Sequence, residues 1–270
     1  MADLSVLGAA GDYRRIAAMW VRSALAYRGS FVTMTISSFL MTFLDFVAIG
    51  LMFHVIDRLA GFELWQVALL YGASGIGIGI ADMVIGSVEL IGQHIRMGTL
   101  DAMLVRPVPL LVQVCADRFA LRRLGRISQT VIVFGYGAWH VDWDLAKVAV
   151  AVLMCVGAVA IFFALFVGVS CVQFWTHDAS EIANAFTYGG NTMTQYPLTI
   201  FPTEVAKSLT FVIPVAFTNW YSCLYLLDRP DPFGAPAWFA LLPLPVGALM
   251  VGLALLVWRA GVRTYTSTGS

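Results

Sequence analysis

Acidic side chains stand within long apolar stretches of this chain, and they are the first residues whose type suggests chemistry. Asp45, Asp82 and Glu89 each lie in a segment apolar enough to cross a lipid bilayer. A carboxylate at the centre of a membrane costs about 2.5 to 3.5 kcal/mol on insertion scales, so it is expected to face a partner, a pore or a bound cation. Two interpretations have equal weight: a route for a polar or cationic substrate, and structural acids bonded to hydroxyl or backbone groups.

Small and polar residues accompany these acids at spacings of three and four, which places them on single helix faces. The first face carries Thr35, Ser38, Thr42 and Asp45. The second face carries Gly72, Gly75, Gly79, Asp82, Gly86, Glu89 and Gln93. Close helix packing is the simpler explanation of the second face, because small residues let helices approach in lipid. If the two faces meet, the residues along a substrate route are Thr42, Asp45, Gly79, Asp82 and Glu89.

Motifs for catalysis, metal binding and nucleotide binding are missing from the sequence. The chain has no HExxH and no Gly-x-Ser-x-Gly motif, and its four cysteines lack metal-ligand spacing. Lys147 and Lys207 are the only lysines, and each follows an alanine, so a phosphate-binding Gly-Lys-Ser/Thr loop cannot exist. We therefore expect no catalytic residue, no metal site and no cofactor in this chain, which is not expected to be an enzyme by itself.

Composition identifies the class of protein. The 270 residues are 60% hydrophobic and only 12% charged, and the mean hydropathy is +0.82. An ordinary soluble domain has about 45 to 50% apolar and about 25% charged residues, so this chain is predicted to be an integral membrane protein. The net charge of +0 gives no reason to expect nucleic-acid binding. No repeat or long linker divides the chain, and residues 1–270 are predicted to form one all-α membrane domain.

Six transmembrane helices are predicted from runs of about 20 apolar residues. Five of them lie near residues 31–56, 65–92, 124–140, 146–175 and 237–258. The fifth crossing is placed at 179–200, followed by a re-entrant element at 203–228, because both segments are interrupted by Gly or Pro. The alternative, in which 205–227 is the crossing, gives the same orientation of the chain.

An amphipathic helix is predicted at residues 12–28, before the first span. Arg14, Arg15 and Arg22 fall on one face, whereas Trp20 belongs to the apolar face. Such a helix is expected to lie in the membrane interface, with its arginines toward lipid headgroups. The alternative is an amphipathic helix that docks on the protein alone.

Arginines set the predicted orientation. Besides the N-terminal helix, the segment between the second and third spans is rich in them, with Arg96, Arg106, Arg118, Arg122, Arg123 and Arg126. Cytoplasmic loops carry an excess of Lys and Arg, so both regions are predicted to be cytoplasmic. No cleavable signal peptide is recognised. The expectation is a multi-pass protein of the cell (inner) membrane with both termini in the cytoplasm.

Residues 95–107 form a charged, turn-prone interruption between two apolar spans. Gly98 is expected to end the second span, Thr99 to cap a new short helix and Asp101 to favour its dipole. Pro107 would then stop this helix. An apolar and charged helix below the membrane is suited to a groove on a soluble partner; the alternative is a simple connecting loop.

The chain resembles the membrane subunits of ABC-2 type exporters, especially the viologen-exporter type of permease. The resemblance spans nearly the whole chain and is carried by segments 95–101, 104–107, 196–202, 211–217 and 265–270. One departure is Tyr221-Ser222-Cys223, where relatives carry an aromatic residue followed by Pro-Ala.

The resemblance implies a coupling helix at 95–107 that docks on cytoplasmic ABC ATPase subunits. Its matching residues are Arg96, Gly98, Thr99, Leu100, Asp101, Leu104, Arg106 and Pro107. It also implies a second permease, identical or similar, and ATP and Mg on the partner subunit. The expected function is ATP-driven export of a hydrophobic, amphipathic or cationic small molecule. The alternative is a proton-coupled secondary transporter that uses Asp45, Asp82 and Glu89, although that class usually shows internal symmetry, which is not visible here.

Overall fold

The structure is a computed structural model that describes residues 6–117, 119, 121–176 and 180–266. Its α-helices are α1 (Val6–Ala26), α2 (Arg28–Val55), α3 (Leu64–Ile85), α4 (Ile91–Arg96), α5 (Thr99–Leu104), α6 (Leu110–Ala116), α7 (Leu124–Ala138), α8 (Leu145–Ser170), α9 (Ser180–Thr194), α10 (Thr203–Phe211), α11 (Trp220–Leu226) and α12 (Pro243–Thr264). The 3₁₀ turns are η1 (Gly86–Leu90), η2 (Leu121–Arg123), η3 (Cys171–Phe174), η4 (Leu198–Ile200), η5 (Val215–Thr218) and η6 (Ala237–Leu241). Among the described residues no strand forms, which agrees with the all-α prediction. Arg118 and residues 267–270, which belong to predicted features, lie outside the described part.

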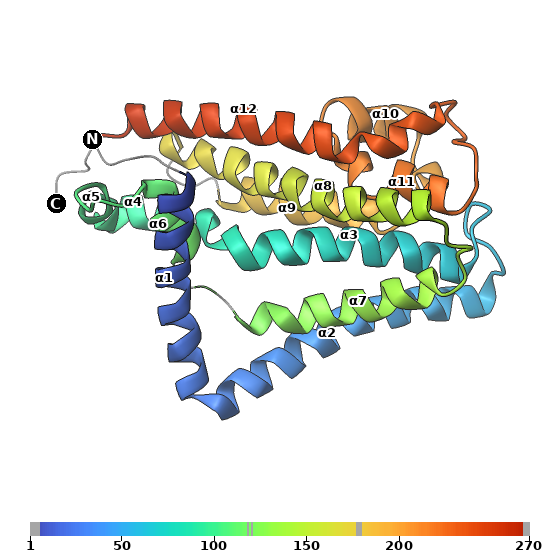
Figure 1. Ribbon diagram of the computed structural model, residues 1–270, viewed down its shortest axis with the longest axis horizontal. Helices are drawn as coiled ribbons and strands as arrows, with labels where there is room; N and C mark the ends of the chain where they lie inside the picture. Colours follow the sequence, from blue (N-terminus) through green and yellow to red (C-terminus); the bar gives the residue numbers. More distant parts are fainter. Residues whose placement is uncertain (1–5, 118, 120, 177–179, 267–270) are drawn as a thin grey trace.

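The long helices run side by side along the long axis of the molecule (Figure 1). The central helix is α3, which packs against α7 and α8 and is buried along almost its whole length. On the two sides, α2 packs on α7 and α12 packs on α8. One end of the bundle holds α4, α5 and α6 and is called the α5 end; the other holds α10 and α11 and is called the α11 end.

Four helical segments within the described residues are long and apolar enough to cross a membrane, and a bent pair would make five. The four are Arg28–Val55, Leu64–Arg96, Leu145–Phe174 and Pro243–Thr264. α7 and α9 have 15 residues each, about 22 Å at 1.5 Å per residue, and a bilayer core is about 30 Å thick. The chain is therefore a multi-pass helical membrane protein, and the count of six crossings stays a prediction.

Glycines allow α3 and α7 to pack closely. A Cβ at Gly72 would lie 2.5 Å from the backbone of Phe134, and one at Gly137 would lie 2.7 Å from the backbone nitrogen of Leu69. Gly75 and Gly79 face Thr130 and Ile127 on the same side of α7 in the same way, so the glycine face of α3 serves helix packing.

The polar face of α2 packs directly on α7. A Cβ at Gly125 of α7 would collide with the α2 backbone at Thr35 and Phe39. The polar face of the first span therefore packs on α7, and it meets the small-residue face of the second span only across a cavity that Thr42, Asp45 and Gly75 line. Periodicity shows which residues share a face, but it does not show that α7 lies between the two helices.

α1 lies across the α5 end, nearly at right angles to the long helices (Figure 1). Arg14, Arg15 and Arg22 are exposed, and Trp20 is partly buried. On the inner face, the Tyr13 hydroxyl donates a 2.7 Å hydrogen bond to the carbonyl of Val84 in α3. The amphipathic helix is thus present, begins at residue 6 rather than 12, and docks on the bundle through its apolar face.

The segment α10–η5–α11 bends by 72° at the α11 end and does not continue straight through the bundle. It is anchored by Asn219, whose amide donates hydrogen bonds to the carbonyls of Leu70 (2.9 Å) and Thr194 (2.5 Å). The bend falls within the segment predicted to be re-entrant, at 203–228. The placement of the fifth crossing at 179–200 stays a prediction.

Candidate functional site

A polar cavity of about 410 Å³ lies between α2, α3, α7 and α9. It is lined by Thr42, Asp45, Ala48, Tyr71, Gly75, Ile78, Arg126, Thr130, Tyr188, Asn191, Thr192, Gln195 and Tyr196. Polar side chains at membrane depth are costly and usually face a bundle interior, a partner or a substrate path. This cavity is therefore the candidate substrate-binding site.

The predicted route residues separate into two groups. Thr42 and Asp45 line the cavity, whereas Gly79, Asp82 and Glu89 do not. Thr42 contributes its carbonyl, which accepts a 3.0 Å hydrogen bond from the Tyr71 hydroxyl and so joins α2 to α3. The carboxylate of Asp45 is exposed and has no hydrogen bond or ion pair with any other described residue.

Asp82 is the centre of a buried ion-pair cluster at the α5 side of the cavity. Its side chain is 4% exposed, and its Oδ2 lies 3.0 Å from Nε of Arg123 and 3.7 Å from Nη1 of Arg126. Arg123 also donates to the Asp82 carbonyl, and the Tyr188 hydroxyl donates to Oδ1 at 3.2 Å. A buried carboxylate needs such partners, so the structural interpretation of Asp82 is the one that its surroundings favour.

The end of α3 is shaped around this cluster. A Cβ at Gly86 would displace the Asp82 carboxylate and the Arg123 guanidinium from their present positions. The helix changes to the 3₁₀ turn η1 at this residue. Glu89, within η1, accepts a 3.3 Å hydrogen bond from the Thr187 hydroxyl of α9, and its role is likewise a contact between segments.

Several cavity residues escaped the sequence reasoning. Arg126 was grouped with the cytoplasmic arginines, yet it lines the cavity, with its guanidinium 5.7 Å from the centre of the Tyr188 ring. Tyr188, Asn191 and Gln195 recur at three and four residues along α9 and the residue after it. That spacing indicates one polar face of a helix. The neighbouring glycines and proline, in contrast, indicate breaks in the backbone, and the prediction for this segment followed those breaks.

α5 is held firmly at its own end of the bundle. Gly98 precedes it with a φ of +66°, the left-handed region that glycine adopts without strain, and Leu100 is fully buried beneath it. The Thr99 side chain makes no capping bond and instead contacts His94 Nδ1 at 2.9 Å through its hydroxyl. The prediction that Thr99 caps the helix is wrong, because Gly98 occupies that position.

The tail of the chain supports the same helix. The Tyr265 hydroxyl donates a 3.0 Å hydrogen bond to Oδ1 of Asp101. Partial burial and the neighbouring Asp101 carboxylate raise the pKa of Tyr265 above its ordinary value. Apolar side chains beside this contact stay uncovered: Leu104 is 43% and Val105 85% exposed.

Comparison with protein families matches residues 39–269 to the ABC-2 family transporter proteins. The chain belongs to this family. The matched residues include those of the cavity and of α5. Membership of this family makes the chain a membrane component of an ABC transporter, not a catalytic subunit. Comparison with curated proteins and with solved structures finds no significant match. The viologen-exporter type stays a prediction.

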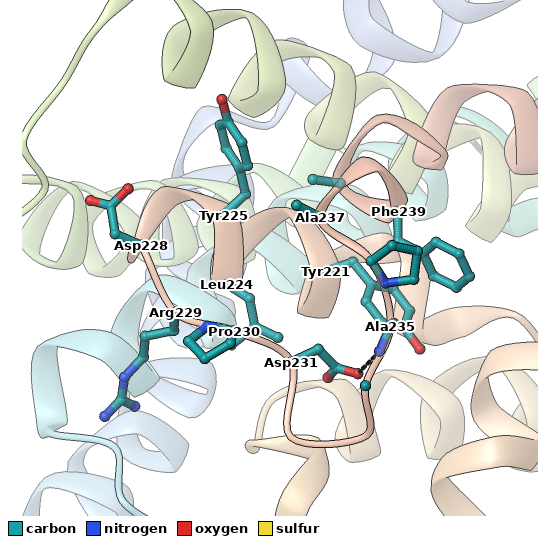
Figure 2. A pocket seen from close by; sticks show the side chains of 13 residues that line it. Tyr221, Leu224, Tyr225, Asp228, Arg229, Pro230, Asp231, Ala235, Ala237 and Phe239 are labelled. Carbon is teal, nitrogen blue, oxygen red and sulfur yellow. Dashed lines mark hydrogen bonds between the residues drawn. The ribbon is translucent and has the colours of Figure 1, made fainter.

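A second cavity of this ABC-2 permease, of about 410 Å³, lies at the α11 end beside the loop that follows α11 (Figure 2). Tyr221, Asp231 and Phe239 line it. The Asp231 carboxylate accepts hydrogen bonds from Trp220 Nε1 and from the Ala235 amide, each 2.9 Å long. Both carboxylate oxygens of Asp231 therefore already have hydrogen-bond partners. This cavity offers a ligand fewer free hydrogen-bonding groups than the cavity between α2 and α9.

Proposed function

We propose that this chain is the permease subunit of an ATP-driven exporter and that residues 95–107 couple it to cytoplasmic ABC ATPase subunits. Membership of the ABC-2 family implies partnership with such ATPases, and in this proposal they hold the ATP and Mg. The observation that carries the proposal is the construction of α5: a short helix that is fixed by its neighbours and leaves apolar residues uncovered. Exposed apolar side chains on a rigid support suit a docking contact.

A continuous path leads from α5 to the cavity. The helix α5 contacts α4, and α4 continues through η1 into α3. At the end of α3, the Asp82–Arg123 pair connects that helix to the start of α7. Movement of α5 by a closing ATPase would shift both walls of the cavity, α3 and α7, together.

Assembly and orientation are part of the same proposal. A second permease, identical or similar, and lipid would together cover the exposed apolar surface of the bundle. With α5 on the ATPase side, the α5 end faces the cytoplasm, and both termini lie there in the cell (inner) membrane. The exposed arginines of α1 would then face lipid headgroups.

The cargo that fits this arrangement is a small amphipathic molecule that enters the cavity between α2 and α9. Of the two acids that would attract a cationic cargo, Asp82 is already paired with Arg123. The same cluster weighs against a proton carrier, because the Asp82 carboxylate is already bound by Arg123, Arg126 and Tyr188.

Copurification with the ATPase tests the proposal. An affinity-tagged chain, isolated from its native membrane in mild detergent, should bring an ATP-hydrolysing subunit with it. Val105→Glu should abolish this association, because the substitution places a charge at the exposed apolar contact. Arg58→Glu, an exposed change at the opposite end, is the control and should retain the ATPase. Retention by the Val105 variant, or absence of any ATPase, would refute the coupling role of α5.

A further inference from the structure

The cavity between α2 and α9 contains charges of both signs, and this decides which ligand it suits. Asp45 supplies a carboxylate from α2, and Arg126 supplies a guanidinium from α7. The adjacent Asp82–Arg123 pair is internally neutral. The cavity as a whole therefore carries no net charge, but it presents an anion and a cation at separate positions on its wall.

The Arg126 guanidinium is available to an anionic group. Its one ion pair within the described residues, to Asp82, is 3.7 Å long, and Asp82 has a closer partner in Arg123. The Arg126 side chain is 31% exposed, and its guanidinium is directed over the Tyr188 ring. An arginine offers five N–H donors in a planar fork that matches a carboxylate or a phosphate. Most of these donors have no hydrogen-bond partner among the described residues.

Asp45 is the complementary half of the site. Its carboxylate is exposed in the same cavity and, among the described residues, has no ion pair that would neutralise it. A charge in the middle of a membrane helix is costly unless something pairs with it. An ammonium group on a ligand would supply the missing partner.

The rest of the wall suits an amphipathic molecule. Asn191, Gln195 and Tyr196 offer neutral hydrogen-bonding groups, whereas Ala48 and Ile78 offer apolar contact. Next to the cavity, α2 exposes apolar side chains along most of its length, including Met41 and Leu44. A hydrocarbon chain can therefore lie along α2 while a polar head occupies the cavity.

We propose that this cavity binds a zwitterionic amphiphile, with its phosphate or carboxylate on Arg126 and its ammonium group on Asp45. A singly charged cation would be attracted by Asp45 but repelled by Arg126. A singly charged anion would be attracted by Arg126 but repelled by Asp45. A zwitterion gains both contacts. The role of such a molecule as cargo rests on the proposed function, whereas its binding does not.

Protection of an engineered cysteine tests the proposal without the ATPase. Thr192→Cys places a thiol in the cavity wall, and the unsubstituted chain gives the background from its own cysteines. The protein is kept in uncharged dodecyl maltoside, and the rate of maleimide labelling is measured with three probes of equal chain length. These are hexylphosphocholine, hexyltrimethylammonium and hexyl methyl phosphate, a phosphodiester that carries a single negative charge. Half-maximal protection should need at least tenfold less of the zwitterion than of either singly charged probe.

Charge-removing variants identify the two contacts. Asp45→Asn should raise the half-protecting concentration of hexylphosphocholine about tenfold while leaving that of hexyl methyl phosphate equal or lower. Arg126→Gln should also raise the half-protecting concentration of hexylphosphocholine about tenfold, while leaving that of hexyltrimethylammonium equal or lower. Asp142→Asn, in an exposed loop away from the cavity, is the matched control and should change nothing. Because Asp45 has no polar partner among the described residues, its variant keeps the test decisive even if the Arg126 variant fails to fold.

The outcomes separate this inference from the proposed function. Equal protection by hexyltrimethylammonium and the zwitterion, or an unchanged preference in Asp45→Asn, would overturn the zwitterion site whether or not an ATPase copurifies. Protection by hexylphosphocholine without a copurifying ATPase would leave the site standing and overturn the transport role. Glycerophosphocholine, which has the same head without the chain, should protect at least tenfold less well; equal protection would overturn the claim that the ligand is an amphiphile.

Discussion

Replacement of Gly72 by alanine tests the contact between α3 and α7 directly. The added Cβ would lie 2.5 Å from the Cα, Cβ and backbone nitrogen of Phe134, and a helix backbone cannot move aside as a flexible side chain can. Overpacking of this kind typically costs about 1 to 3 kcal/mol. Gly135→Ala, on the facing helix, is the matched control, because a Cβ there meets nothing within 4 Å.

Thermal unfolding of the purified protein in detergent, followed by tryptophan fluorescence, measures this effect. Each kcal/mol shifts the melting temperature by about 2 to 4 °C in a soluble protein approaching this size, so Gly72→Ala should melt several degrees below Gly135→Ala. Both substitutions give the same gain in helix propensity, and the difference isolates the clash. Gly137→Ala, whose Cβ would lie 2.7 Å from the Leu69 nitrogen, should behave like Gly72→Ala. Equal melting temperatures for Gly72→Ala and Gly135→Ala would refute the close α3–α7 contact.

Three further predictions concern the ion-pair cluster and α5. Asp82→Asn or Arg123→Gln alone should each cost about 3 to 5 kcal/mol in the same melting assay, and the double variant should recover part of the loss; additive losses would show that the pair is not coupled. Gly98→Ala should cost about 1 to 2 kcal/mol, because alanine disfavours the observed φ of +66°, and an unchanged melting temperature would contradict that backbone geometry. Tyr265→Phe removes the hydrogen bond to Asp101 and should speed amide hydrogen exchange in α5 without changing exchange in α8; unchanged exchange in α5 would show that the tail does not support it.

The α5 region illustrates what local sequence can and cannot predict. A glycine between two helices, an acidic residue in the first turn and prolines beyond the end are signals carried by a few adjacent residues, and each has a counterpart in the structure. The contact between Tyr265 and Asp101 joins residues 164 positions apart. No local pattern predicts that contact, because it depends on where α12 ends relative to α5.

The sequence by itself determined the membrane class, the amphipathic first helix, the long apolar helices and the packing role of the α3 glycines. These properties follow from composition and from a helical period that adjacent residues express together. Only the tertiary structure decided that α7 lies between α2 and α3, that Arg123 neutralises Asp82, and that Asp45 and Arg126 share one cavity. Helical period fixes the face on which a residue lies, but the neighbour of that face is chosen by packing among all the helices at once.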